Sequence, residues 1–241
     1  EHGIPVFNAP YSNTRSVVEL ALAEMIMLMR NIPDRSREMH EGVWNKSASN
    51  SFEVRGKKLG IIGYGNIGSQ LSIIAEALGL EVHFYDVEDK LALGNAHYTA
   101  SMEELLAKVD IVSLHVDGRA ENELFFGEKE FDAMKDGAVF LNLARGFTID
   151  VPVLAKHLKS GKIRGAAVDV FPIEPKSNQE EFISELRGLP NLILTPHIGG
   201  STEEAQESIA QFVPSKIKDY INTGNTFSSV NFPNLQLPKL K

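Results

Sequence analysis

The sequence contains no cysteine, which excludes a disulfide framework, a thiol nucleophile and a cysteine metal site. It also has no apolar run long enough to span a bilayer, and no basic run that would suit a nucleic-acid backbone or an anionic membrane surface. The first residues have none of the features of a secretory signal. These absences are typical of a soluble protein of the reducing cytoplasm, with neither nucleic acid nor membrane as a partner.

The 241 residues, 43% of them apolar, are enough for one large domain or two small ones, and the net charge is −8. There is no methionine at position 1, and residues 3–8 are typical of a short strand, so a secondary-structure element is predicted from almost the first residue. We therefore expect the chain to be a piece of a longer protein.

One stretch of the sequence predicts a dinucleotide site. A predicted strand over residues 58–62 leads into Gly63-Tyr64-Gly65-Asn66-Ile67-Gly68. A predicted helix over residues 67–78 and a second strand over residues 81–85 follow, and Asp86 comes directly after them. This order of strand, glycine turn, helix, strand and acid is much more specific than the glycine spacing alone.

Each glycine of this stretch has a chemical reason. Gly63 allows a sharp turn, Gly65 allows the backbone to approach a pyrophosphate, and Gly68 allows the helix to pack on the strand. The amides at the start of the helix then face the phosphates. Asp86 would accept hydrogen bonds from the ribose hydroxyls and repel a 2′-phosphate, which predicts NAD as the cofactor. The alternative is that Asp86 is only a solvated strand end.

The segment before this stretch has two parts. Residues 14–30 predict a helix that is apolar on nearly every side, so it needs cover all round, either from a second subunit or from within one subunit. Residues 31–54 are expected to form a polar, irregular excursion that contains Trp44. We expect Trp44 to lie in a dimer interface; the alternative is a local hydrophobic anchor.

From residue 58 onward apolar strands and helical stretches alternate, which predicts a fold of the α/β class, with a doubly wound parallel sheet of the Rossmann type. In a sheet of order 3-2-1-4-5-6 the ligand crevice lies outside the carboxyl ends of the strands. Capping boxes are predicted at residues 101–104 and 201–204, and Pro214 should kink the last helix or mark its start. The six predicted strands cover residues 59–62, 82–85, 111–114, 138–142, 165–169 and 192–195.

Three polar residues follow the last three predicted strands, namely Arg145, Glu174 and His197. This set suits hydride transfer between a nicotinamide and a 2-hydroxy acid, because Arg145 can bind a carboxylate with two hydrogen bonds and polarise a carbonyl. His197 can exchange the hydroxyl proton, and Glu174 can fix the imidazole tautomer. Each residue also has an ordinary explanation as part of a turn or loop. His115 follows the third strand and lacks an acidic partner, so it is expected only to line the cofactor pocket.

Together these motifs resemble the D-2-hydroxyacid dehydrogenase family. Residues 7–10, 13–17, 42–46, 55–59 and 230–233 are further similar to family members that act on 3-phospho-D-glycerate. The resemblance implies NAD-dependent oxidation of that substrate, the first step of serine synthesis. The motifs that carry the family resemblance are Gly63 to Gly68, Asn142-Leu143-Ala144-Arg145-Gly146, Asp169-Val170-Phe171 with Glu174-Pro175, and Pro196-His197-Ile198-Gly199-Gly200-Ser201-Thr202.

The resemblance also implies roles for single residues, domain bounds and a homo-oligomer, a dimer or tetramer formed through the NAD-binding domain. Arg145, Glu174 and His197 would be catalytic, and no metal is expected. The NAD-binding domain would cover residues 13–200, and residues 1–12 and 201–241 would belong to a substrate domain whose other part is missing, as is a C-terminal regulatory domain. The residues implied in cofactor binding are Gly63, Gly65, Asn66, Ile67, Gly68, Asp86, Leu143, Ala144, Asp169, Gly199 and Gly200.

Two features leave alternatives open. Asp117-Gly118 stands where many family members have a proline, and this difference is expected to alter the conformation of a loop near the nicotinamide. The alternative functions are a relative that acts on glyoxylate, hydroxypyruvate or D-lactate, and an NAD-sensing scaffold without catalysis. The intact set of arginine, glutamate and histidine argues against the scaffold.

Overall fold

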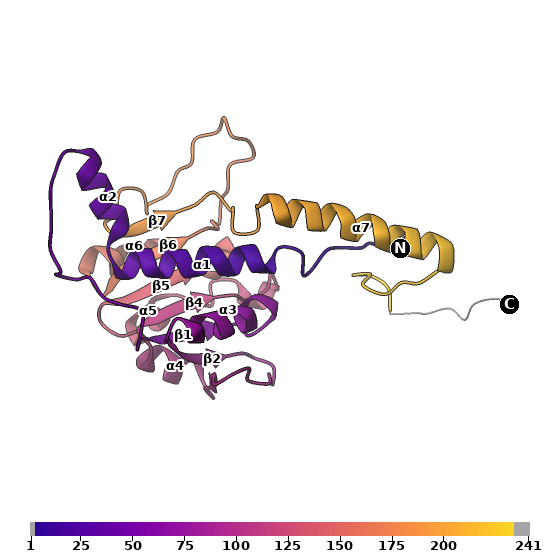
Figure 1. The fold of residues 1–241 in the computed structure, drawn as a ribbon, viewed down its shortest axis with the longest axis horizontal. Coiled ribbons are helices and arrows are strands. Elements are labelled where there is room, and N and C mark those ends of the chain that lie inside the picture. Colours follow the sequence, from indigo (N-terminus) through magenta and orange to yellow (C-terminus); the bar gives the residue numbers. More distant parts are fainter. Residues whose placement is uncertain (1–2, 234–241) are drawn as a thin grey trace. The chain divides into compact units, whose positions relative to one another are not determined.

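The computed structural model describes residues 3–233 (Figure 1). The chain divides into two compact units: Val17–Gly199, and Glu1–Ser16 together with Gly200–Lys241. The boundaries expected from the sequence fall after residues 12 and 200, and the assignment of these units to an NAD-binding domain and a substrate domain stays a prediction. No helix in the described part combines the length and the apolar character that a membrane span requires.

The larger unit is built around a parallel sheet, and seven strands lie in it among residues 3–233, in the order β3-β2-β1-β4-β5-β6-β7. The strands are β1 (Lys58–Ile62), β2 (Glu81–Tyr85), β3 (His97–Tyr98), β4 (Ile111–Leu114), β5 (Ala138–Asn142), β6 (Ile163–Val168) and β7 (Leu192–Leu194). The helices are α1 (Thr14–Met29), α2 (Ile32–His40), α3 (Asn66–Ala77), α4 (Met102–Lys108), α5 (Glu128–Ala133), α6 (Val151–Ser160) and α7 (Glu203–Thr223).

Strand β3 was not predicted, and its presence changes the order of the sheet. It contains two residues, too few for an alternating pattern, and it pairs with His83 and Phe84 of β2. The order 3-2-1-4 therefore holds only when β3 is counted as the third strand. The third predicted strand, residues 111–114, is β4 and pairs directly with β1 rather than lying beyond β2. The point where the strand order reverses consequently lies between β1 and β4.

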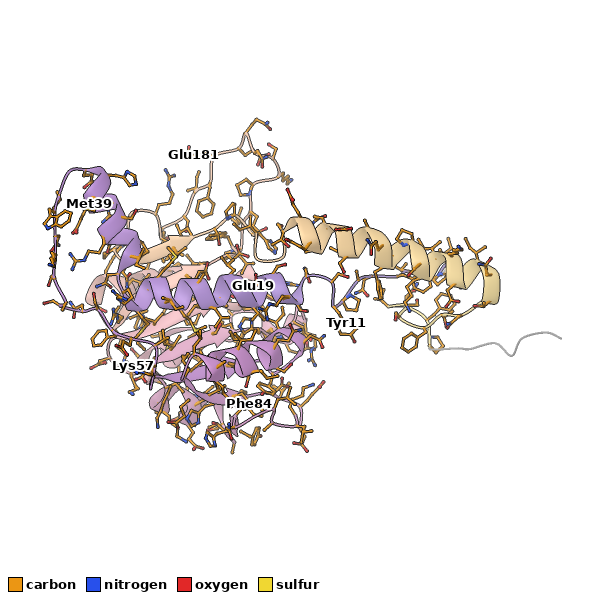
Figure 2. All side chains as sticks on the ribbon, in the orientation of Figure 1. Tyr11, Glu19, Met39, Lys57, Phe84 and Glu181 are labelled. Carbon is orange, nitrogen blue, oxygen red and sulfur yellow. The ribbon has the colours of Figure 1, made fainter. Side chains whose placement is uncertain are left out.

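Helices cover both faces of the sheet, so the predicted doubly wound α/β fold is confirmed (Figure 1). Successive strand residues point to opposite faces. In β5, Val139 and Leu141 contact the core that α1 and α3 cover, whereas Ala138 and Phe140 contact the core that α4, α5 and α6 cover. Phe84, labelled in Figure 2, is fully buried in the first of these cores.

The segment 31–54 is not irregular throughout, because α2 occupies its first part. Pro33 stands at the start of this helix, and ion pairs between side chains three residues apart, such as Arg37 with Asp34, support it. Trp44 is 77% exposed, so the alternative of a local hydrophobic anchor is wrong. Its place in a dimer interface stays a prediction.

The smaller unit contains α7 and the described ends of the chain. Thr202, not Ser201, is the N-cap of α7, and its side chain accepts from the amide of Ala205 at 3.1 Å. Pro214 lies inside the helix and does not mark its start. Phe7 forms an antiparallel bridge with Ser229. The sequence from Pro233 to Lys241 is typical of a proline-rich linker, and after residue 233 it lies outside the described residues.

Candidate active site

The turn after β1 forms the first part of the candidate site. Gly63 has a φ of +93°, and a Cβ there would lie 2.7 Å from the backbone carbonyl of His115. A Cβ on Gly68 would lie 2.3 Å from the carbonyl oxygen of Gly63. The chain's own packing therefore requires both glycines. At Gly65, by contrast, no atom of the described residues lies within 4 Å of a Cβ, which leaves room for the predicted approach of a pyrophosphate.

Helix α3 begins directly after this turn, with Asn66 and Ile67 in its first turn. Gly65 is the N-cap residue and has no side chain that could accept from the first amides of the helix. These amides and the positive end of the helix dipole are consequently available to an anion.

Asp86 follows β2 and is fixed beside the glycine turn. Its Oδ2 accepts from the amide of Tyr64 at 2.7 Å, and its Oδ1 accepts from the amide of Glu88 at 2.9 Å. A carboxylate has about four acceptor positions, so two remain for a ligand. This geometry fits the predicted acceptor for the ribose hydroxyls.

Partly buried hydrogen bonds shape the turn after β5 that presents Arg145. The carbonyl of Arg145 accepts from Asn142 Nδ2 at 3.2 Å and from the Thr148 hydroxyl at 2.6 Å. The exposed guanidinium donates, among the described residues, only to the carbonyl of Ala144. Most of its five donors are thus available to a substrate carboxylate. Leu143 and Ala144 are 6% and 3% exposed, so they would meet a cofactor mainly through their backbone.

Asp169 directly follows β6 and holds the loop after β7. Its buried carboxylate accepts from the hydroxyl of Thr195 at 2.6 Å and from the amides of Ile198 at 2.9 Å and Gly199 at 2.8 Å. Its carbonyl accepts from the amide of His197 at 2.8 Å. His197 has a φ of +55°, a conformation that costs free energy for a residue with a side chain. Asp169 therefore stabilises the strained loop that carries His197.

The structure brings Glu174 and His197 into contact. His197 Nδ1 lies 3.0 Å from Glu174 Oε2, and Glu174 Oε1 accepts from the amide of Phe171 at 3.1 Å. Partial burial works to raise the pKa of Glu174. The hydrogen bonds from His197 and Phe171 and the charge of Arg145 outweigh burial and hold this pKa below its ordinary value. An ionised Glu174 accepts from Nδ1–H, and Nε2 is then the acceptor that can take a proton.

Glu24 on α1 is a buried ionisable group that is not among the site residues predicted from the sequence. It is 1% exposed, and neither carboxyl oxygen has a hydrogen-bond partner among the described residues. Burial, together with the charge of Asp169, raises the pKa of Glu24 to about 8, so the carboxyl group is neutral at pH 7. The signal in the sequence was its spacing from Ala21 and Leu28, which places all three on the buried face.

Three further predicted residues, His115, Gly199 and Gly200, lie in different surroundings. His115 Nε2 lies 2.8 Å from Ser113 Oγ, its Nδ1 is buried without a partner among the described residues, and burial lowers its pKa to about 4. A Cβ on Gly199 would lie 2.9 Å from Asp169 Oδ2. Gly200 belongs to the smaller unit, where a Cβ would lie 2.4 Å from Asn13 Nδ2. The contacts of these residues with a cofactor stay predictions.

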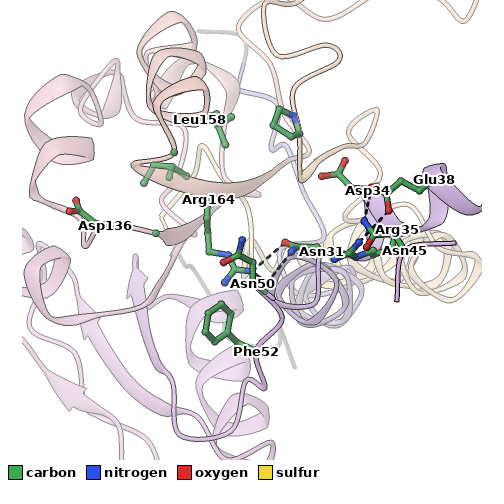
Figure 3. A pocket seen from close by; sticks show the side chains of 14 residues that line it. Asn31, Asp34, Arg35, Glu38, Asn45, Asn50, Phe52, Asp136, Leu158 and Arg164 are labelled. Carbon is green, nitrogen blue, oxygen red and sulfur yellow. Dashed lines mark hydrogen bonds and ion pairs between the residues drawn. The ribbon is translucent and has the colours of Figure 1, made fainter. Parts of the chain in front are cut away.

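A hollow of about 650 Å³ opens at the opposite edge of the sheet, where β5, β6 and β7 begin (Figure 3). Arg164 lies in it beside Asn31 and Asn50, with its guanidinium 4.6 Å from the ring centroid of Phe52. Its Nη2 donates to Asn31 Oδ1 at 3.3 Å and to the carbonyl of Asn50 at 2.7 Å. The volume suits a small molecule, but the polar groups are already bonded to one another.

One group of possible metal ligands occurs among the described residues: Glu128, Asp132 and His157, with ligand atoms within 4.8 Å of one another. His157 Nε2 is already 3.0 Å from Asp132 Oδ1, and Lys156 pairs with Glu128. These contacts give the three side chains a structural role on α5 and α6.

Comparison with known proteins gives the family. Residues 22–199 match the family model of the D-isomer specific 2-hydroxyacid dehydrogenase, NAD binding domain. The chain is 59% identical to the D-3-phosphoglycerate dehydrogenase of Haemophilus influenzae and 52% identical to that of Escherichia coli K12, over 98% and 99% of its length. It spans 58% of the length of each of these relatives.

A solved structure gives the same picture of the fold. The D-lactate dehydrogenase of Lactobacillus jensenii with NAD+ matches with a TM-score of 0.86 at 28% identity. The match covers 95% of this chain and 72% of that chain.

Proposed function

The chain belongs to the D-isomer specific 2-hydroxyacid dehydrogenases, and we propose that, as part of a longer protein, it oxidises 3-phospho-D-glycerate to 3-phosphohydroxypyruvate with NAD, the first step of serine synthesis. The observation that carries this proposal is the pair of Glu174 and His197 beside the loop held by Asp169. The names of the relatives that are 52% and 59% identical support the substrate.

NAD is the cofactor that the chain's residues fit. The open space at Gly65 and the free first amides of α3 suit a pyrophosphate, and the fixed carboxylate of Asp86 suits the adenosine ribose. When bound, NAD+ accepts the hydride from the carbon that carries the hydroxyl group. The larger unit would be the NAD-binding domain, and the smaller unit would be part of the substrate domain.

The catalytic roles follow from the hydrogen-bonding capacity of Arg145, His197 and Glu174, which lie beyond the carboxyl ends of the strands. The guanidinium of Arg145 binds the substrate carboxylate and stabilises the charge on the carbonyl oxygen that forms. His197 Nε2 takes the hydroxyl proton in oxidation and returns it in reduction. Glu174 accepts from Nδ1–H, which fixes the tautomer and stabilises the charged imidazole. We place the contacts to the substrate phosphate outside this chain.

We further propose a homodimer or homotetramer in which α1 and the segment 31–54 contact a second copy. Ile26 on α1 is 37% exposed, and Trp44 is 77% exposed. Large exposed apolar side chains on neighbouring segments are typical of an interface. Analytical ultracentrifugation of the chain and of Trp44→Ala tests this; a monomeric parent chain would contradict it.

The test of the function is an assay on the longer protein that contains the chain. With 3-phospho-D-glycerate and NAD+, the absorbance of reduced nicotinamide should rise, and D-lactate, glyoxylate and hydroxypyruvate should be poorer substrates in the matching directions. A preference for one of these three would replace the substrate. No turnover with any of them, despite NADH binding, would favour the NAD-sensing scaffold instead.

The chain by itself should bind NADH but turn over slowly or not at all, because it spans 58% of the length of its relatives and we place the contacts to the substrate phosphate outside it. Isothermal titration calorimetry with NADH tests the first half of this statement. A folded sample that shows no NADH binding would contradict the proposed function.

A further inference from the structure

Two loops near Asp86 hold a cluster of charged side chains. Glu88 and Lys90 follow β2, and Asp117 and Arg119 follow β4. Lys90 Nζ lies 2.5 Å from Glu88 Oε2, and Arg119 Nε lies 2.7 Å from Asp117 Oδ2. Arg119 Nη2 also lies 4.0 Å from Glu88 Oε1. Glu88 therefore pairs with both cations and connects the two loops.

The cluster lies where the adenosine half of a dinucleotide would enter. β2 and β4 are the two neighbours of β1, so the pair of Glu88 with Arg119 crosses the end of β1, where the glycine turn begins. The amide of Glu88 donates to Asp86 Oδ1 at 2.9 Å. Lys90 therefore lies close enough to Asp86 for their charges to interact, and Arg119 is connected to Asp86 through Glu88.

These cations are of the kind that binds a 2′-phosphate, but carboxylates already occupy them. Arg and Lys side chains are the usual partners of a phosphate. The hydrogen bond between Lys90 and Glu88 lowers the pKa of Glu88 and raises that of Lys90, so both are charged at neutral pH. With Asp86 and Asp117 the cluster has three negative and two positive groups, and a phosphate would meet a net negative charge.

We propose that Glu88 is a second residue that determines cofactor specificity, because it holds Lys90 and Arg119 in ion pairs and keeps them from a 2′-phosphate. This inference rests on the proposed function, since it takes the dinucleotide to lie against the glycine turn and Asp86. Replacing Asp86 alone removes one repulsive charge. Replacing Glu88 as well frees Lys90 and leaves Arg119 paired with Asp117 alone, so the cluster becomes net positive and attracts a phosphate.

Calorimetric titration of NADPH and NADH tests the inference on four proteins: the parent chain, Asp86→Ala, Glu88→Gln and the double variant. At pH 7 and low salt, the double variant should bind NADPH roughly fivefold to tenfold more tightly than Asp86→Ala does. The NADH affinities of these two variants should differ by less than about twofold. The gain should shrink in high salt, because these groups are exposed and screened. Adding Lys90→Met to the double variant should remove part of the gain.

The matched control is Asp89→Asn combined with Asp86→Ala. Asp89 is the next residue along the chain, is exposed, and makes no ion pair in the described structure. This control changes the net charge by the same amount but releases no cation. Exposed ion pairs contribute little to stability, so all variants should fold.

The outcomes distinguish a failure of this inference from a failure of the proposed function on which it rests. Equal NADPH affinity in the double variant and in the Asp89 control would overturn the role of Glu88, while NADH binding by the parent would leave the proposed function intact. A folded parent chain that binds neither dinucleotide would overturn both. Tighter NADPH binding in the double variant alone supports the inference.

Discussion

The two edges of the central sheet both carry arginine and acidic side chains, yet they differ in how many of their polar groups are already bonded. At the amino edge, where β5, β6 and β7 begin, Arg164 donates to backbone and amide oxygens, and Arg35 pairs with Glu38 at 3.3 Å. At the carboxyl edge, where the strands end, Arg145 donates to a single carbonyl and His197 contacts a carboxylate through one ring nitrogen, counted over residues 3–233.

This difference shows that volume alone does not identify a site. The amino edge has a hollow of about 650 Å³, and its groups join the segment 31–54 to the start of β6. The carboxyl edge has donors and acceptors held in place with capacity left for a ligand, through the bonds of Asp86 and Asp169. Substitutions of the polar groups with free capacity at the carboxyl edge should therefore change binding and turnover, and those of the bonded polar groups at the amino edge should change stability.

The largest expected effect is that of His197→Ala in the longer protein. Turnover should fall by about 10²–10⁴-fold with NADH affinity kept, because the group that exchanges the proton is lost. Steady-state kinetics and calorimetry measure the two quantities. His40→Ala, an exposed histidine on α2, is the control and should leave both unchanged. Unchanged turnover in His197→Ala would remove this histidine from the mechanism.

Glu24 should make folding stability depend on pH. Its pKa rises from an ordinary value of 4.5 to about 8 in the folded chain, so the unfolded state loses its proton first as the pH increases. The stabilising contribution is complete below pH 4.5 and is lost progressively up to about pH 8, in total on the order of 5 kcal/mol.

Urea unfolding at several pH values measures this effect. Relative to the parent, Glu24→Gln should gain about 1.4 kcal/mol of unfolding free energy per pH unit within that window. Glu19→Gln, an exposed glutamate on the same helix, is the control. A difference between Glu24→Gln and the parent that stays constant with pH would show that the buried carboxyl group does not titrate as described.

Arg164→Met tests whether the groups at the amino edge contribute to stability and not to NADH binding. It removes hydrogen bonds of a charged, partly buried group, so the free energy of unfolding should fall by about 1.5–3 kcal/mol. NADH affinity should not change. Arg37→Met, an exposed arginine on α2, should cost much less. If Arg164→Met weakened NADH binding while the chain stayed folded, the amino edge would become the candidate site.

Gly65→Ala is the smallest change with a defined outcome at the carboxyl edge. A methyl group there meets no atom of the described residues within 4 Å, so stability should be kept while NADH affinity falls about tenfold. Gly68→Ala should instead unfold or destabilise the chain, because its Cβ would lie 2.3 Å from a carbonyl oxygen. Calorimetry and thermal melts distinguish the two. Full NADH affinity in Gly65→Ala would place the pyrophosphate elsewhere.

Long, periodic elements and the glycine turn could be predicted from the sequence, because local spacing alone specifies them. Strand β3 could not, because two residues have no period and pair only with β2. The sequence does not predict α2, because none of its residues is buried and it has no apolar stripe; Pro33 and the residues of its ion pairs are the signals that favour a helix there. The N-cap at Thr202 was assigned one residue too early, since Ser201 has the same chemistry.

The residues of the candidate site were predictable as types but not as contacts. Arg145, Glu174 and His197 stood out because each follows a predicted strand. That Asp169 accepts three hydrogen bonds from the loop after β7 depends on tertiary structure. The effect of the charge of Asp169 on the pKa of Glu24 does so too, because 145 positions separate the two residues in the sequence.

The most direct test of the account is a crystal structure of the chain with NADH. The account predicts the pyrophosphate against Gly65 and the first amides of α3, the ribose against Asp86, and the nicotinamide beside Asp169 and His197. A dinucleotide bound in the amino-edge hollow at Arg164, or a nicotinamide ring turned away from His197, would contradict it.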